Sequence, residues 1–87
     1  MQAITTKFLG PTNTKGSRIK ASCWLKSKTV SWDYSLNVEQ NHIEAAKQLV
    51  ADLNLDRAKK DNSGSWVVVA SGSLAEAGYA IIIDLDF

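Results

Sequence analysis

The chain has 87 residues, of which 45% are hydrophobic and 22% are charged, and its formal net charge at pH 7 is +1. This length allows a single domain, residues 1–87, with one core but no deep pocket as well. The lone cysteine, Cys23, excludes an internal disulfide and a cysteine-rich zinc site, and no apolar run approaches the roughly 20 residues of a membrane span. The N-terminus lacks the long apolar core of a signal peptide, so a cytoplasmic location is expected.

The small net charge hides an uneven distribution along the chain. Residues 1–28 contain six bases and no acid, whereas residues 29–56 contain five acids and one base. The folded protein is therefore expected to have a basic region from its first strands and an acidic region along the segment that follows them.

Residues 2–9 and 18–26 are expected to form two strands that are joined by the loop 10–17. Alternation is clearest in 18–26, where one face holds Ile19, Ala21, Cys23 and Leu25 and the other holds Arg18, Lys20, Ser22, Trp24 and Lys26. A turn near Ser27 leads into a further strand, 29–34, so these segments are expected to form a tight hairpin.

Residues 37–54 have the only convincing helical pattern. Asn37 is a favourable N-cap, and Gln40 stands at the position that completes a capping box. Asn54 is expected to end the helix in the left-handed conformation. The apolar stripe consists of His42, Ala45, Ala46, Leu49, Val50 and Leu53. Such a helix is not stable alone, so it must lie on another element.

The remainder is expected to contain a polar loop at 56–65, a short strand at 66–70, a connection at 71–78 and a last strand at 79–87. The first half of 79–87 is apolar on both faces, which favours a place inside the sheet rather than at its edge. The order β-β-β-α-β-β predicts an α+β domain with two layers, an antiparallel five-stranded sheet and one helix packed on one of its faces.

The loop 10–17, GPTNTKGS, is the first candidate site. A phosphate-binding loop needs glycine before its lysine and a helix directly after it, whereas a strand follows here, so a nucleotide site is not expected. Two interpretations remain. The loop is either a plain hairpin connection or an exposed contact patch formed by Thr12, Asn13, Thr14 and Lys15.

The polar face of 18–26 is the second candidate site. If the Ile19 face packs on the helix, the opposite face presents Arg18, Lys20, Trp24 and Lys26 to solvent. This set suits a protein partner, because Trp and Arg are common interface hot spots, and it equally suits a nucleic acid. The alternative is that Trp24 is covered by the last strand or the 71–78 connection and that the lysines are merely solvated.

Other polar residues give little indication of chemistry. His42 has no second histidine or cysteine nearby, and Cys23 among aliphatic neighbours is expected to be a buried, inert thiol. Asp84 and Asp86 are expected to serve solubility rather than cation binding. No serine, histidine and acid stand in a catalytic spacing. We therefore expect a non-enzymatic protein with no catalytic residues, no metal and no cofactor.

The run TKFLGPTNTKGSRIKAS (6–22) and the segment EQNHIEAAKQL (39–49) resemble small uncharacterised proteins found in phages, plasmids and integrated elements. The second half, WVVVASGSLAEAGYAIIIDLDF, departs from their pattern. The resemblance implies a genetic setting more than a chemistry. Small accessory proteins of mobile elements are often binders that block a host defence assembly, such as a CRISPR surveillance complex or a restriction enzyme.

The leading hypothesis is therefore a small binding protein of a phage or mobile element, such as an anti-CRISPR or other host-defence inhibitor, that occludes a host protein or nucleoprotein complex in the host cytoplasm. The expected contact residues are Thr12, Asn13, Thr14, Lys15, Arg18, Lys20, Trp24 and Lys26. The alternative is a nucleic-acid-binding protein that uses the same face, although its near-neutral charge counts against this. A third hypothesis is a homodimer formed by strand pairing or by a patch around Trp66.

Overall fold

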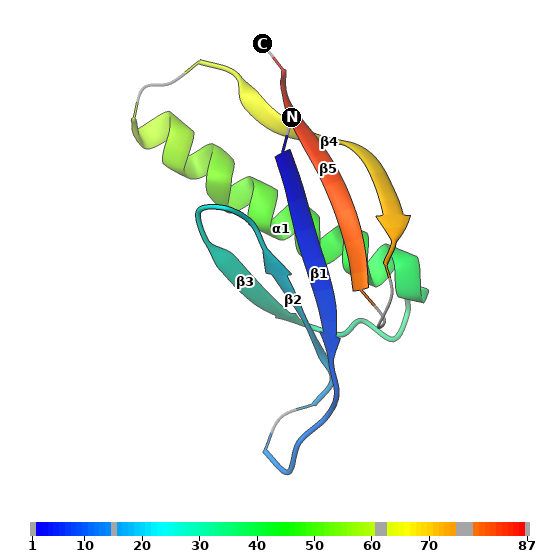
Figure 1. Cartoon of the computed structure of the whole chain (residues 1–87). Coiled ribbons are helices and arrows are strands. Elements are labelled where there is room, and N and C mark those ends of the chain that lie inside the picture. The colour runs from blue at the N-terminus through cyan, green and yellow to red at the C-terminus, as the bar shows by residue number, and fades with distance from the viewer. Residues whose placement is uncertain (1, 15, 61–62, 75–77, 87) are drawn as a thin grey trace.

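The computed structural model describes residues 2–14, 16–60, 63–74 and 78–86, which form one five-stranded antiparallel sheet and one helix (Figure 1). The elements are β1 (Gln2–Leu9), β2 (Arg18–Ser22), β3 (Ser27–Ser31), α1 (Val38–Lys59), β4 (Ser65–Ser73) and β5 (Gly78–Asp86). The strand order is β3-β2-β1-β5-β4, so α1 connects the two edges of the sheet. The predicted fold class, two layers with the helix on one face, is confirmed.

The first and last strands are neighbours in the centre of the sheet. β1 pairs with β5 on one side and with β2 on the other, and Ile4 of β1 lies opposite Ile81 of β5. β5 also pairs with β4, which confirms the prediction that the last strand lies inside the sheet.

The core lies between α1 and the face of the sheet that α1 covers. Its buried hydrophobic residues are Ile4, Ile19, Ala21, Ala45, Ala46, Leu49, Val50, Leu53, Ile81 and Ile83. The two alanines of α1 leave room for the helix backbone to approach the sheet. Because one helix covers one face only, the opposite face of the sheet has no covering layer among the described residues (Figure 1).

The start of α1 follows the prediction, and its end does not. The Gln40 N–H donates to Asn37 Oδ1 at 2.8 Å, and the Asn37 N–H donates to Gln40 Oε1 at 3.3 Å, which completes the capping box. The predicted end at Asn54 is wrong, because the helix continues to Lys59. The Asn54 side chain instead holds the backbone of Trp66, accepting from its N–H at 2.6 Å and donating to its carbonyl at 3.2 Å.

The additional turn of α1 contacts the chain that follows the helix. The Arg57 guanidinium donates to the carbonyls of Ser63 and Gly64, so it fixes the chain just before β4. Gly64 has a φ of 81°, which favours glycine at this bend. The predicted loop 56–65 therefore begins only after the helix.

The hairpin turn lies earlier than predicted. β2 ends at Ser22, and the Cys23 N–H donates to the Lys26 carbonyl at 3.0 Å, which places Trp24 and Leu25 at the tip of the turn. The strand predicted over 18–26 is therefore too long, and Cys23 is half-buried in a turn rather than buried on a strand. Polarity suggested a turn at Ser27, but Ser22 and Ser27 pair across the ladder.

The last hairpin is longer than the apolar pattern indicates. β4 runs to Ser73, and Ser71, Gly72 and Ser73 pair with β5 although the sequence predicts a connection there. These pairs are made by backbone groups, so they need no apolar side chain. The register shifts between Val68 and Ala70, where the strand contains a bulge.

Replacement of Leu49 by alanine is expected to lower the free energy of unfolding by about 2–5 kcal/mol, because Leu49 is fully buried between helix and sheet. Leu55→Ala on the same helix is the matched control, since Leu55 is 60% exposed and its loss is expected to change stability by about 0.5 kcal/mol or less. Urea denaturation followed by circular dichroism measures both. Equal losses would contradict the assignment of the buried helix face.

Candidate functional site

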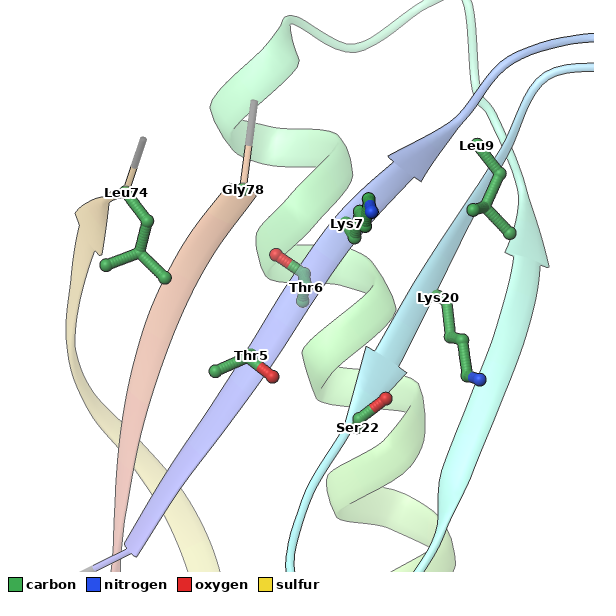
Figure 2. A pocket seen from close by; sticks show the side chains of 8 residues that line it. All are labelled: Thr5, Thr6, Lys7, Leu9, Lys20, Ser22, Leu74 and Gly78. Carbon is green, nitrogen blue, oxygen red and sulfur yellow. The ribbon is translucent and has the colours of Figure 1, made fainter. Parts of the chain in front are cut away.

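The face of the sheet opposite α1 carries a polar, basic set of side chains. Strand alternation places it on β1, β2 and β3, since Ile4, Ile19 and Val30 pack on the other side. We call this set the open-face patch, which consists of Thr5, Lys7, Leu9, Arg18, Lys20, Ser22, Ser27, Thr29 and Ser31. Figure 2 shows part of it, with α1 behind the strands and Thr5, Lys7 and Lys20 in front of them.

Two lysines face each other in the middle of the open-face patch. Lys7 and Lys20 are directly opposed in the pairing of β1 with β2, and Lys20 lies opposite Thr29 of β3. Like charges at directly opposed positions of a sheet destabilise it. Neither lysine forms an ion pair with a residue of the described ranges. The repulsion between them is therefore uncompensated within this part of the chain.

Among the residues that the structure describes, no acidic side chain lies close to this pair. β1, β2 and β3 contain no Asp or Glu. Asp84 lies on the same face of β5, but Lys7 pairs with Gly78, and six residues of strand between Gly78 and Asp84 span roughly 20 Å. Thr5, Ser22 and Thr29 supply hydroxyl groups around the lysines. The open-face patch therefore has a positive potential with hydrogen-bonding groups around it.

The lysines on the helix side of the same hairpin are neutralised. Lys26 Nζ lies 2.6 Å from Asp56 Oδ2, and Lys28 Nζ lies 3.0 Å from Asp52 Oδ2. The hydrogen bond with Asp56 raises the pKa of Lys26, and the same bond lowers the pKa of Asp56. The prediction that Lys26 stands on the outer face is wrong, because the turn at Trp24 and Leu25 reverses the chain before Lys26.

Trp24 also lies away from the open-face patch. Its ring meets that of Trp66 edge to face with centroids 5.2 Å apart, and Trp66 packs against the core on the helix side. The Arg57 guanidinium lies 6.0 Å from the Trp66 ring. Trp24 does not lie on the open face as predicted, because it contacts Trp66. The alternative, that the last strand or the 71–78 connection covers Trp24, is also wrong, because the side chain remains 51% exposed.

The structure thus divides the predicted contact residues. Arg18 and Lys20 belong to the open-face patch, whereas Trp24 and Lys26 lie in the turn at the opposite end of β2 from the loop 10–17. Thr12, Asn13 and Thr14 are exposed in that loop, which projects beyond the sheet (Figure 1), and Lys15 lies outside the described residues.

Sequence reasoning missed Lys7 as a site residue. Alternation in 2–9 places Thr5 and Lys7 on the face opposite Ile4, but their position beside Lys20 depends on the register of β1 with β2. Together with Leu9, Ser22 and Leu74 of the 71–78 region, they line a shallow hollow of about 320 Å³ (Figure 2).

A second feature lies where the helix side of the sheet meets the N-terminal end of α1. A cavity of about 420 Å³, which we call the aromatic cavity, is lined by Phe8, Ser17, Trp32, Tyr34, Val38 and His42. The rings of Phe8 and Trp32 meet at 85° with centroids 5.1 Å apart, so they form two walls at a right angle. Trp32 and Tyr34 lie after β3 instead of on it as predicted.

His42, which the sequence places on the apolar stripe of the helix, is buried, since only 1% of it is exposed. Its Nδ1 lies 2.7 Å from Thr6 Oγ1, and its ring stacks at a tilt on Tyr79 with centroids 4.4 Å apart. Burial lowers the pKa of His42, so the ring is neutral at pH 7.

Asn41 fixes the segment that carries the walls of the aromatic cavity. Its Oδ1 accepts from the Asp33 N–H at 2.8 Å, and its Nδ2 donates to the carbonyls of Asp33, Leu36 and Asn37. Asn41 is 4% exposed, and no pattern in the sequence marked it. Its four hydrogen bonds hold the chain between β3 and α1 in one conformation.

Comparisons of the chain with protein-family models, curated proteins and solved structures found no match. Within the described ranges, no three His, Cys, Asp or Glu side chains are grouped so as to hold a metal ion. α1, the helix that the structure describes, is not long and apolar enough to span a membrane. The open-face patch and the aromatic cavity are therefore the candidate binding sites of the described residues.

The stability of the protein is expected to decrease as the pH falls through the range below 6.5, the ordinary pKa of histidine. The folded protein has the lower His42 pKa, so the unfolded chain binds the proton more readily and acid favours unfolding, by at most about 1.4 kcal/mol per pH unit. His42 is the only histidine in the chain. Urea denaturation between pH 5 and 8 should therefore show this slope in the wild type and not in His42→Asn. A slope retained in the variant would contradict the assignment.

Proposed function

We propose that the chain is a small, non-enzymatic binding protein of a phage or related mobile element, which acts in the host cytoplasm. It uses the open-face patch to cover an acidic surface of a host protein complex, such as a CRISPR or restriction assembly. The Lys7–Lys20 pair is the observation that carries this proposal. The element of origin and the defence assembly rest on the resemblance of residues 6–22 and 39–49 to small proteins of mobile elements.

In the free protein, the repulsion between Lys7 and Lys20 lowers stability. Two directly opposed lysines repel each other, and no described acid offsets them. A partner carboxylate placed between their ammonium groups would remove this repulsion and gain two charge-assisted hydrogen bonds. By contrast, Lys26 and Lys28 form ion pairs with Asp56 and Asp52 of α1. None of the described acids is paired with Lys7 or Lys20, which supports a role of these lysines in association.

A protein partner is favoured over a nucleic acid by the side chains of the open-face patch. Nonspecific binding to a single strand combines cations with aromatic rings that stack on bases. None of the open-face residues is aromatic, because Phe8, Trp32 and Trp66 pack on the helix side of the sheet. Nucleic-acid binding through the cations alone is the alternative function, and it predicts an affinity that falls steeply with salt.

Substitution of both central lysines, Lys7→Glu with Lys20→Glu, is expected to remove the partner. Each charge reversal places a carboxylate against an acidic surface, so the loss of affinity should exceed tenfold, about 1.4 kcal/mol or more. The measurement is capture from host lysate by the tagged protein, followed by titration of the identified complex. Lys47→Glu with Lys59→Glu, which makes the same charge change on α1, is the matched control and should capture normally.

The capture experiment distinguishes a protein partner from a nucleic acid. Equal capture by the wild type and by Lys7→Glu with Lys20→Glu would contradict the proposal. Capture that disappears after nuclease treatment, together with a gel shift that weakens steeply with salt, would favour the nucleic-acid alternative. A captured defence complex should also lose activity in the presence of the wild type and keep it with the double variant.

A further inference from the structure

We infer that the aromatic cavity is a second contact site, which receives a tyrosine side chain from the same acidic protein partner. The inference rests on the proposed function for the identity of the partner. The size, walls and hydrogen-bonding groups of the cavity argue separately for the ring that it takes.

The cavity has room for an aromatic ring between aromatic walls. Its volume of about 420 Å³ lies at the small end of the range of roughly 300–1,000 Å³ that is typical of ligand sites. Phe8 and Trp32 stand at 85° to each other, and Val38 closes a third side. A ring that enters this corner lies against one wall and edge-on to the other, which are the two arrangements that aromatic pairs prefer.

His42 lines the cavity, and one of its ring nitrogens is left for a ligand. His42 Nδ1 is engaged by Thr6, whereas His42 Nε2 has no hydrogen-bond partner among the described residues. It is also not fully enclosed, since no fully buried side-chain nitrogen or oxygen lacks a partner. A phenol hydroxyl both donates and accepts, so it pairs with this nitrogen in either tautomer of the neutral ring.

The residues around the cavity disfavour a charged ligand. Aromatic walls attract cations, but no carboxylate lines this cavity. Arg18 lines the neighbouring hollow together with Trp32 and Tyr34, and its charge repels a cation there. An anion would lose its hydration against walls that are almost entirely apolar. A neutral ring with one hydroxyl group matches both the walls and the His42 nitrogen.

The aromatic cavity adjoins the open-face patch, so we assign the tyrosine ring to the partner that covers the patch. The neighbouring hollow, of about 650 Å³, is lined by Arg18, Thr29 and Ser31 of the patch and shares Ser17, Trp32 and Tyr34 with the cavity. A partner that covers Lys20 and Arg18 therefore reaches the mouth of the cavity without a gap. Tyrosine is also among the residues most enriched at the centres of interfaces.

The first test titrates the isolated protein with p-cresol, the analogue of a tyrosine side chain, and with toluene, which lacks the hydroxyl. NMR signals of the His42 imidazole and the Trp32 indole should shift saturably with p-cresol. The hydroxyl should make p-cresol bind about 2- to 10-fold more tightly than toluene, the gain expected for one net hydrogen bond. No saturable shift, or equal binding of the two compounds, would overturn the inference.

A second variant separates the cavity from the patch. Val38 is 53% exposed at the mouth, so Val38→Trp should fill the cavity without unfolding the chain, and Val38→Ala is the matched control. Circular dichroism checks the fold. Val38→Trp should abolish p-cresol binding and weaken capture of the partner at least tenfold, whereas Lys7→Glu with Lys20→Glu should leave p-cresol binding unchanged. Loss of p-cresol binding with undiminished capture would overturn the assignment to a partner tyrosine, while the proposed function would stand.

Discussion

The covering of one sheet face by a single helix determines which side chains are available for binding. Strand alternation assigns successive residues to opposite faces, so Ile19 lies in the core while its neighbour Lys20 stands in solvent. The helix side holds the core and the rings of Trp32, Trp66 and Tyr79. The open side holds lysines, an arginine and hydroxyl groups from three strands. The binding surface is therefore a direct consequence of the two-layer architecture.

The electrostatics of the two sides differ for the same reason. Acids on α1 reach Lys26 and Lys28, which lie on the helix side, and form ion pairs with them. They do not reach Lys7 and Lys20, which lie behind the sheet as seen from the helix. The open-face patch thus retains the repulsion between Lys7 and Lys20, although one acidic residue at either position would remove it. Proteins often accept a loss of stability of this kind at sites that bind a partner.

Local signals in the sequence predicted local features well. The capping box of Asn37 and Gln40 lies within one helical turn, and the alternation of Ile19 and Ala21 with Lys20 identifies a core face without knowledge of the neighbouring strands. The end of α1 could not be found in this way, because the Asn54 side chain bonds to the backbone of Trp66, twelve residues away. The pairing of Lys7 with Lys20 likewise depends on strand register, which a single strand does not contain.

The site residues could not be placed correctly from the sequence because the position of the hairpin turn was not predicted. Once the chain reverses at Trp24 and Leu25, Trp24 meets Trp66, Lys26 meets Asp56, and the predicted mixture of cations and an indole separates into two places. Charge and turn propensity alone favoured Ser27, because a tryptophan and a leucine are unusual at a turn. Contacts with α1 and β4 stabilise this turn, and those contacts exist only in the folded protein.

The stability of Lys20→Glu in the free protein tests the repulsion between Lys7 and Lys20 most directly. If Lys7 and Lys20 repel each other without compensation, the substitution creates an attractive pair, and the free energy of unfolding should rise by about 0.2–1 kcal/mol at low salt, with a smaller gain at high salt. Lys26→Glu, which breaks the pair with Asp56, should change stability in the opposite direction. A Lys20→Glu protein that is no more stable than the wild type at low salt would contradict the account.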